Sequence, residues 1–390
     1  MNPSATGWIL KLLKQVEKNH LLLKYSEDDF YEELRSCGFI YGSNQEIIGQ
    51  VLKKDDLTEE ELCKLNLAIS FYYIHIQSET NEVFSDSVIN FYKSINETRK
   101  TFFNDLLSGK KSSEQLEKII HRRIQINGNL ITKNFNYFII NALLFVDVLA
   151  FKKYLSDDAI SIDYLKNMEA AIASISLDVL NSKAIKNQYD ESLIKLFESS
   201  LRYYDNSNLD YKTALNFIKT DFEKFYILDL ACMATWTDAI IDIEEQKFLK
   251  KLGQDLNLNV SIIKTSIETV NQFYTTNKDN IVLLSSKNIV QSFYNNSSRV
   301  VIKLITRNSK RLYRELKDSK ELMVLLTQST IRDLNKEEQK KVQEQLLDIF
   351  KSIPSLAIFL LPGGALLLPL VVKFIPKLLP SAFDENRIED

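Results

Sequence analysis

The chain has 390 residues, 45% of them hydrophobic, which is enough material for two or three domains with buried cores. Its formal net charge of −3 gives no overall reason to expect nucleic acid or an anionic surface as a partner. The three cysteines form no CxxC pair and the three histidines have no second ligand at helical spacing. No metal ligand, cofactor or disulfide framework is therefore predicted.

The first twenty residues contain no targeting signal. Lys11 and Lys14 interrupt the apolar run before a signal peptide can form, and the first arginine, Arg35, comes too late for a mitochondrial transit peptide. We therefore expect the bulk of the protein to stay in the cytoplasm. The same stretch is amphipathic, and it either packs on the body of the protein or docks at a membrane interface.

Most of the chain lacks helix breakers. Only one of the six prolines and seven of the nine glycines precede residue 354, and apolar residues recur at spacings of three and four. No sustained alternation indicates a strand. The sequence predicts an all-α fold, with a multi-helix cytoplasmic body and one proline-kinked C-terminal membrane segment.

Clusters of small and polar residues are typical of linkers, and four of them divide the chain. They predict helical regions at 1–110, 111–210 and 211–297, basic amphipathic helices at 298–352, a membrane segment at 353–383 and an acidic tail at 384–390.

One interior segment, residues 135–151, is apolar enough to compete as a membrane span. It is shorter than the roughly 20 apolar residues that a spanning helix needs, and it contains Asn136, Asn141 and Asp147. A carboxylate at mid-depth in lipid is costly. We predict a buried core helix here.

Residues 225–258 resemble a TerB-type helical module, in which an acidic pair opens a helix. The matching positions are Asp238, Ile241, Asp242, Glu244 and Glu245, with Ala239 in place of the usual glycine. As an EF-hand this stretch fails, because Ile243 and Leu249 occupy the turn-glycine and bidentate-glutamate positions. The carboxylates either bind a metal in another way or favour a helix N-terminus through its dipole.

A basic stripe lies between residues 299 and 317. Its spacing of mostly three and four puts the cations on one side of a helix, with Val301, Ile305, Leu312 and Leu316 on the other. This face is either simply solvated or contacts lipid headgroups or RNA phosphates. The cations are Arg299, Lys303, Arg307, Lys310, Arg311, Arg314 and Lys317.

The stretch from Ile353 to Val372 contains 20 residues without a charge. At about 1.5 Å per residue, a helix of this length reaches across the roughly 30 Å core of a bilayer. Lys351 and Lys373 flank it at headgroup depth. The alternative is a buried hairpin of a soluble domain.

Prolines crowd into this same stretch. Pro362, Pro369 and Pro376 are seven apart, so on one continuous helix they form a stripe. Each proline releases a backbone carbonyl, which in lipid needs a protein or water partner. Gly363 and Gly364 add a flexible point. The stripe either faces a partner helix or a wet crevice, or simply kinks an anchor.

These residues carry a resemblance to the LETM family of membrane proteins. The start of the family's membrane segment is matched by Asp348, Phe350, Lys351 and Pro354, its middle by Pro362 and Pro369, and its end by Ile375, Pro376, Leu379, Pro380, Ser381 and Phe383. The arrangement is similar to that of short bacterial LETM-related, biofilm-associated proteins. The resemblance implies a bacterial inner-membrane location and self-association through the membrane segment.

Two departures from the family bear on function. Ala365 stands where the family carries an intramembrane glutamate implicated in cation exchange, which weakens a transport role. The family also continues into a ribosome-binding-like domain, which we expect to be missing here.

No acid–base or nucleophilic constellation is visible, so no catalytic residue is named and an enzyme is not expected. The sequence favours a membrane-tethered scaffold or assembly factor with protein partners. The alternatives are cation or proton translocation by an oligomer, and ribosome binding at the membrane.

Overall fold

The computed structural model describes most of the chain. The described residues are 2–3, 5–19, 21–52, 57–96, 111–124, 144–157, 160–186, 190–191, 194–195, 197–198, 210–235, 243–277, 298, 301–302, 304–306, 308–353, 356, 359 and 367–379. Within these ranges every regular element is a helix, which confirms the all-α prediction.

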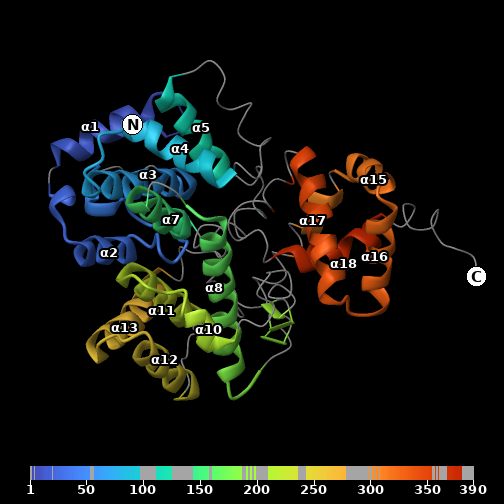
Figure 1. Ribbon diagram of the computed structural model, residues 1–390. Coiled ribbons are helices and arrows are strands. Elements are labelled where there is room, and N and C mark those ends of the chain that lie inside the picture. The colour runs from blue at the N-terminus through green and yellow to red at the C-terminus, as the bar shows by residue number, and fades with distance from the viewer. Residues whose placement is uncertain are drawn as a thin grey trace, which may run out of the picture.

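Eleven α-helices and the short turns η1 and η2 (Ile48–Gln50), all within the described residues, form the body of the protein (Figure 1). They are α1 (Trp8–Lys18), α2 (Glu27–Ser36), α3 (Glu59–Gln77), α4 (Phe84–Asn96), α5 (Ser112–Ile124), α7 (Leu144–Asp157), α8 (Ile162–Ser182), α10 (Tyr211–Leu215), α11 (Asp221–Thr235), α12 (Ile243–Asp255) and α13 (Val260–Asn277), with the short turn η1 (Leu22–Lys24).

Helix α3 is the centre of the N-terminal half. A capping box between Thr58 and Glu61 satisfies its first amide groups, and it packs against α1, α5 and α7. Its rings stack closely with those of neighbouring helices, as in the pair Phe30–Tyr73 with ring centroids 3.7 Å apart. This helix therefore anchors the core of the N-terminal half.

Helix α1 packs on the body, which decides between the two expectations for the N-terminus. Trp8, Leu12 and Val16 are buried against the core, and the helix contacts α3 and α5. The carboxylate of Glu117 on α5 accepts hydrogen bonds from the backbone N–H groups of Gly7 (3.0 Å) and Ile9 (3.1 Å). Packing and this cap together hold α1 in place.

The second half of the body is built around α8, which packs against α10, α11 and α12 (Figure 1). Contacts cross the predicted divisions near residues 110 and 210, because α5 packs on α3 and α4, and α8 packs on α10 and α11. The described part of the apolar segment, residues 144–151, lies in α7 and is buried, as predicted for a core helix.

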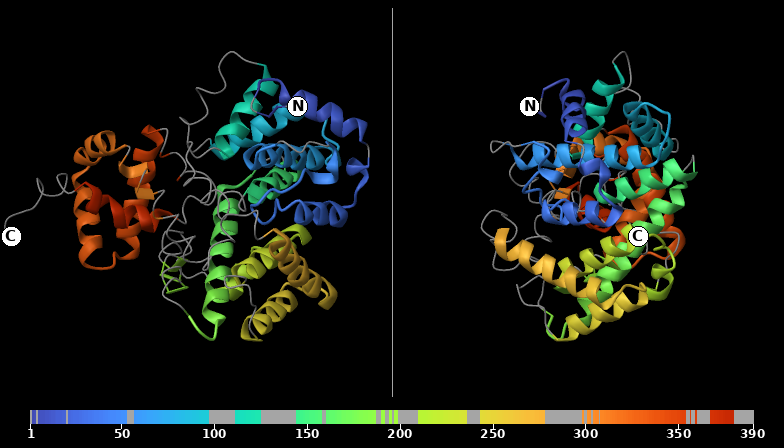
Figure 2. Two further views of the ribbon diagram at one scale, coloured as in Figure 1. Left: turned by 180° about the vertical axis from the view of Figure 1, so that it is seen from behind. Right: turned by 90° about the vertical axis from the view of Figure 1, so that its left-hand side faces the viewer.

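Four helices make up the C-terminal module, the name used below for α15 (Ser309–Lys317), α16 (Lys320–Ile331), α17 (Lys336–Ser352) and α18 (Leu368–Leu378). Helix α16 packs against the other three, and α15 also contacts α17. Figures 1 and 2 show these helices, in orange and red, as one group beside the body.

Candidate functional site

Helix α17 of the C-terminal module begins with a capping box. Asn335 accepts a hydrogen bond from the backbone N–H of Glu338, and the Glu338 carboxylate accepts one from the Asn335 N–H, which is a capping box. Arg332 donates to both carboxylate oxygens of Glu338 at 2.6 and 2.8 Å. Arg332 and the Asn335 amide hold the pKa of Glu338 at about 2. The Arg332–Glu338 ion pair and the capping box together therefore hold the turn between α16 and α17.

The last helix, α18, begins in the apolar segment at Leu368. Pro369 is its second residue, where the missing N–H has no intrahelical acceptor in any case. The predicted stripe assumed one continuous helix through Pro362, Pro369 and Pro376; the structure instead starts a helix just before Pro369. Pro376 lies inside the last turn of α18, two residues before its end at Leu378.

Several residues of the predicted membrane segment lie outside the described residues, and nothing is said of their structure. They are Pro354, Pro362, Gly363, Gly364, Ala365 and Pro380, together with Ser381 and Phe383 of the family motif.

The apolar face of α18 is covered by protein. Leu368, Val371 and Ile375 are fully buried, and the helix packs against α16. Among the helices that the structure describes, none combines the length and the apolar character needed to cross a bilayer. Most of the charge-free stretch itself falls among residues that the structure does not describe.

The other motif residues belong to the C-terminal turns of α17. Phe350 is buried and its ring lies 5.0 Å from that of Phe359, while Asp348 and Lys351 form an ion pair of 2.6 Å on the outside. The motif thus combines one core aromatic residue with a surface ion pair at the end of a helix.

The described half of the basic stripe forms one exposed face on α15. Lys310, Arg311, Arg314 and Lys317 are all exposed, whereas Leu312 and Leu316 on the opposite side are fully buried. Val301 and Ile305 are also buried, as the periodicity predicts. Arg299, Lys303 and Arg307 lie outside the described residues.

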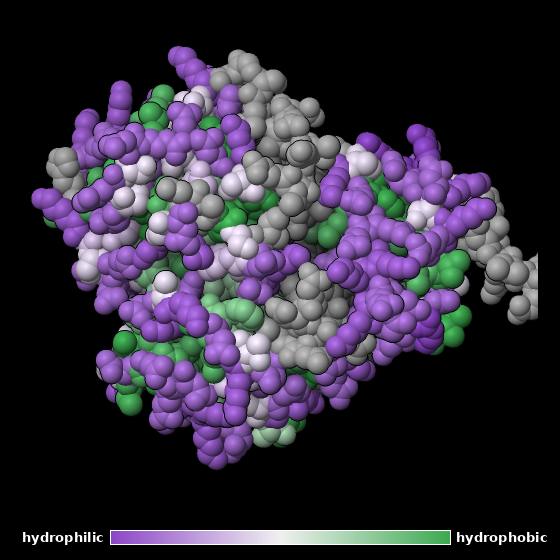
Figure 3. Space-filling view, viewed as in Figure 1, coloured by the Kyte–Doolittle hydropathy of each residue, from purple (hydrophilic) through white to green (hydrophobic). Residues whose placement is uncertain are grey.

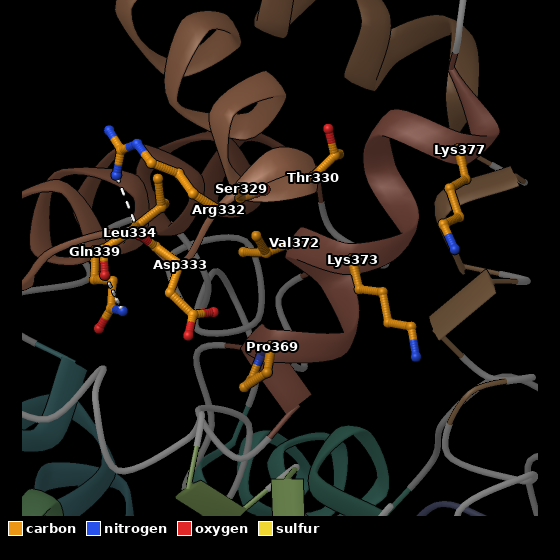
Figure 4. A pocket seen from close by; sticks show the side chains of 10 residues that line it. All are labelled: Ser329, Thr330, Arg332, Asp333, Leu334, Gln339, Pro369, Val372, Lys373 and Lys377. Atoms are coloured by element: carbon orange, nitrogen blue, oxygen red, sulfur yellow. Dashed lines mark hydrogen bonds between the residues drawn. The ribbon is translucent and has the colours of Figure 1, made fainter.

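A recess of about 280 Å³ lies between the end of α16, the α16–α17 turn and α18 (Figure 4). In Figure 4 Pro369 and Val372 lie between Asp333 on one side and Lys373 on the other, with Lys377 beyond it. The hydroxyl groups of its lining residues Ser329 and Thr330, and the amide of Gln339, donate to backbone carbonyls. The recess therefore separates α18 from the α16–α17 turn. Lys373 and Lys377 are the two lysines among its lining residues.

Among the described residues, two buried arginine–aspartate pairs were not foreseen from the sequence, and both lie in the body. Arg35 on α2 donates to both oxygens of Asp229 on α11 at 2.8 and 3.0 Å, and Tyr31 donates to the same carboxylate at 2.9 Å. Arg35 also reaches Ser266 on α13. Burial and the neighbouring Asp229 raise the pKa of Tyr31 well above its usual range, so it remains a donor.

The second pair repeats this arrangement in the N-terminal half. Arg123 donates to both oxygens of Asp147 at 2.7 and 3.1 Å, and Tyr92 donates to the same carboxylate at 2.8 Å. Asp147 is the residue that argued against a membrane span. For each of the two pairs, the only sequence signal was the aspartate within an apolar run. Both pairs join helices and leave no group exposed for chemistry.

The acidic residues of the TerB-like stretch act structurally where they are described. Glu245 is buried with its Oε1 atom 3.9 Å from the Nζ of Lys183, and Glu244 pairs with Lys247 at the surface. Asp238, Ala239, Ile241 and Asp242 lie outside the described residues. In the part of the chain that the structure describes, no group of three potential ligands forms a metal site.

The site thus defines an all-helical module with a basic helix on one side and an apolar, proline-containing helix packed inside. The family model "LETM1-like, RBD" matches residues 334–390, which begin in the α16–α17 turn and continue past α18. The match covers 57 of the 390 residues. No curated protein and no solved structure matches the chain.

This match confirms the LETM-like character of the C-terminal segment. It also corrects one expectation. The family's ribosome-binding-like part was expected to be missing, but the matching family model is itself the ribosome-binding-domain (RBD) model, and it covers the proline-rich segment. The TerB-like and biofilm-associated resemblances stay predictions.

Proposed function

We propose that this protein is a non-enzymatic, membrane-tethered scaffold or assembly factor of the LETM-like class. The helical body holds protein partners, and the C-terminal segment is the tether. The observation that carries the proposal is the coincidence of two features in one place. The LETM1-like match at 334–390 encloses the 20-residue charge-free stretch from Ile353 to Val372.

The tether belongs to a bacterial inner membrane, with the body on the cytoplasmic side, and copies of the chain associate through the membrane segment. This placement is supported by the match of residues 334–390 to the LETM1-like family model. The absence of charge over the stretch makes transfer into lipid favourable for its side chains.

Fractionation of cells tests the tether. The full chain is compared with a 1–297 truncation, which removes the whole C-terminal module. A cut after residue 352 is unsuitable, because removing α18 exposes the apolar face of α16 that packs against it. We expect only the full chain to stay in the membrane pellet after washes with high salt and then alkaline carbonate. Release of the full chain by salt alone would contradict an integral tether.

Ribosome binding at the membrane is the second candidate function. It is favoured by the RBD description of the matching family model and by the exposed cations of α15. Co-sedimentation with ribosomes that withstands moderate salt supports it, whereas loss at moderate salt reduces it to nonspecific charge attraction. Cation or proton translocation is favoured by no described residue, and Ala365, the position on which it depends, lies outside them.

A further inference from the structure

The exposed face of α15 presents a row of cations to solvent. At 100° per residue, Lys310, Arg314 and Lys317 fall within an arc of about 60°. Lys310 and Arg314 form no ion pair or hydrogen bond within the described part of the chain. The acidic residues of this stretch lie off the arc or at its end, since Glu315 is half-buried and Asp318 is the C-cap.

The position of this face relative to the apolar segment is fixed by a contact. Arg311, at the edge of the arc, donates from its guanidinium to the backbone carbonyl of Ser352 at the end of α17. The charge-free stretch begins at the next residue, Ile353. Buried Leu312 and Leu316 prevent the helix from turning its basic side inward. The cations are therefore held beside the point where the chain enters the apolar segment.

The position of this face beside the apolar segment favours lipid phosphates over RNA phosphates as its ligand. If the segment after Ser352 enters a bilayer, its first residues lie at headgroup depth, and the α15 face comes to the same level. Contact with RNA requires no such relation between the basic face and an apolar segment. The hydrophilic surface over α15 is visible at the upper right of Figure 3.

We propose that the α15 face, Lys310, Arg314 and Lys317, docks on the headgroups of anionic phospholipids next to the tether. This proposal rests on the proposed membrane tether and adds the lipid class and the residues that recognise it. Each cation near an anionic surface contributes about five-fold to binding. The attraction weakens with salt, as the screening length falls from about 10 Å at 0.1 M to about 3 Å at 1 M.

The test uses the full chain and vesicles of phosphatidylcholine with or without phosphatidylglycerol. The variant Lys310→Gln/Arg314→Gln removes two exposed cations and is expected to lower partitioning onto anionic vesicles about 25-fold. Partitioning onto phosphatidylcholine alone should not change. The matched control is Lys93→Gln/Lys250→Gln, which removes the same charge from exposed positions on α4 and α12. Circular dichroism checks that both variants are folded.

The outcomes separate this inference from the proposed function. A loss confined to the α15 variant and to anionic vesicles supports it. Equal partitioning of wild type and α15 variant overturns it, while the tether stands if both still bind. Failure of the wild type to bind either vesicle overturns the tether and the inference with it. Unchanged vesicle binding together with lost binding to a ribosomal RNA fragment assigns the face to RNA and overturns the lipid proposal.

Discussion

Replacing Asp229 by asparagine should destabilise the body of the protein strongly. The carboxylate is fully buried on α11 and accepts hydrogen bonds from three groups of α2: two guanidinium nitrogens of Arg35 and the hydroxyl of Tyr31. Asparagine keeps the size of the side chain but removes its charge. Arg35 is then left as a buried cation whose remaining partners are Ser266 and the exposed Glu32.

The expected cost follows from that uncompensated charge. Removing one partner of a buried ion pair costs about 3–5 kcal/mol, and we expect the lower end because Glu32 still neutralises part of Arg35. Tyr31→Phe removes a single hydrogen bond to a charged acceptor and should cost about 1.5 kcal/mol. Replacing both charges, as in Arg35→Met/Asp229→Leu, should cost less than Asp229→Asn alone, because no buried charge is left over.

Urea unfolding followed by circular dichroism measures these free energies. The control is Glu244→Gln, which breaks an exposed pair with Lys247 and should cost at most about 1 kcal/mol. A cost for Asp229→Asn no larger than that of the control would refute the reasoning. So would an Arg35→Met/Asp229→Leu variant less stable than the single mutant.

Three further outcomes are expected. Asp147→Asn should also cost about 3–5 kcal/mol in urea unfolding, because it leaves Arg123 buried and unpaired; a cost below about 1 kcal/mol would contradict the pairing. Gly253→Ala should cost about 1–3 kcal/mol, because its new Cβ atom meets the Cγ1 of Ile263 at 2.3 Å, and combining it with Ile263→Ala should cost less than the sum of the two. The lowered pKa of Glu338 means that its contribution to stability is present above pH 4.5 and is lost as the pH falls to about 2; an acid titration should show this loss in the wild type and not in Glu338→Gln, and identical profiles would refute it.

The helical class and several faces could be predicted because they depend on local spacing. The absence of proline between Pro3 and Pro354 and the recurrence of apolar residues at three and four already indicate helices. The same spacing places Leu312 and Leu316 on the buried side of α15, as the structure has them. Neighbouring residues suffice for this kind of inference.

The buried ion pairs could not be predicted, because their partners are far apart in the chain. Arg35 and Asp229 are separated by 194 positions, and no local pattern marks the arginine as a core residue. Only the carboxylate within an apolar run hinted that a partner was needed.

The proline positions show a different limit of sequence reasoning. A seven-residue spacing defines a stripe only if one helix runs through all three positions. Since Pro369 suits the first turn of a helix, the same spacing is equally compatible with a helix that begins at Leu368.

The central claim is that the C-terminal segment tethers the protein to its membrane through the part of the charge-free stretch around Leu361. The most direct test is thiol labelling of a Leu361→Cys variant in native membranes. The background is low, because the three native cysteines are buried and burial raises the pKa of Cys37 to about 12. The account predicts labelling by a lipid-soluble maleimide and none by a membrane-impermeant one, from either side. Equal labelling by the impermeant reagent would contradict it.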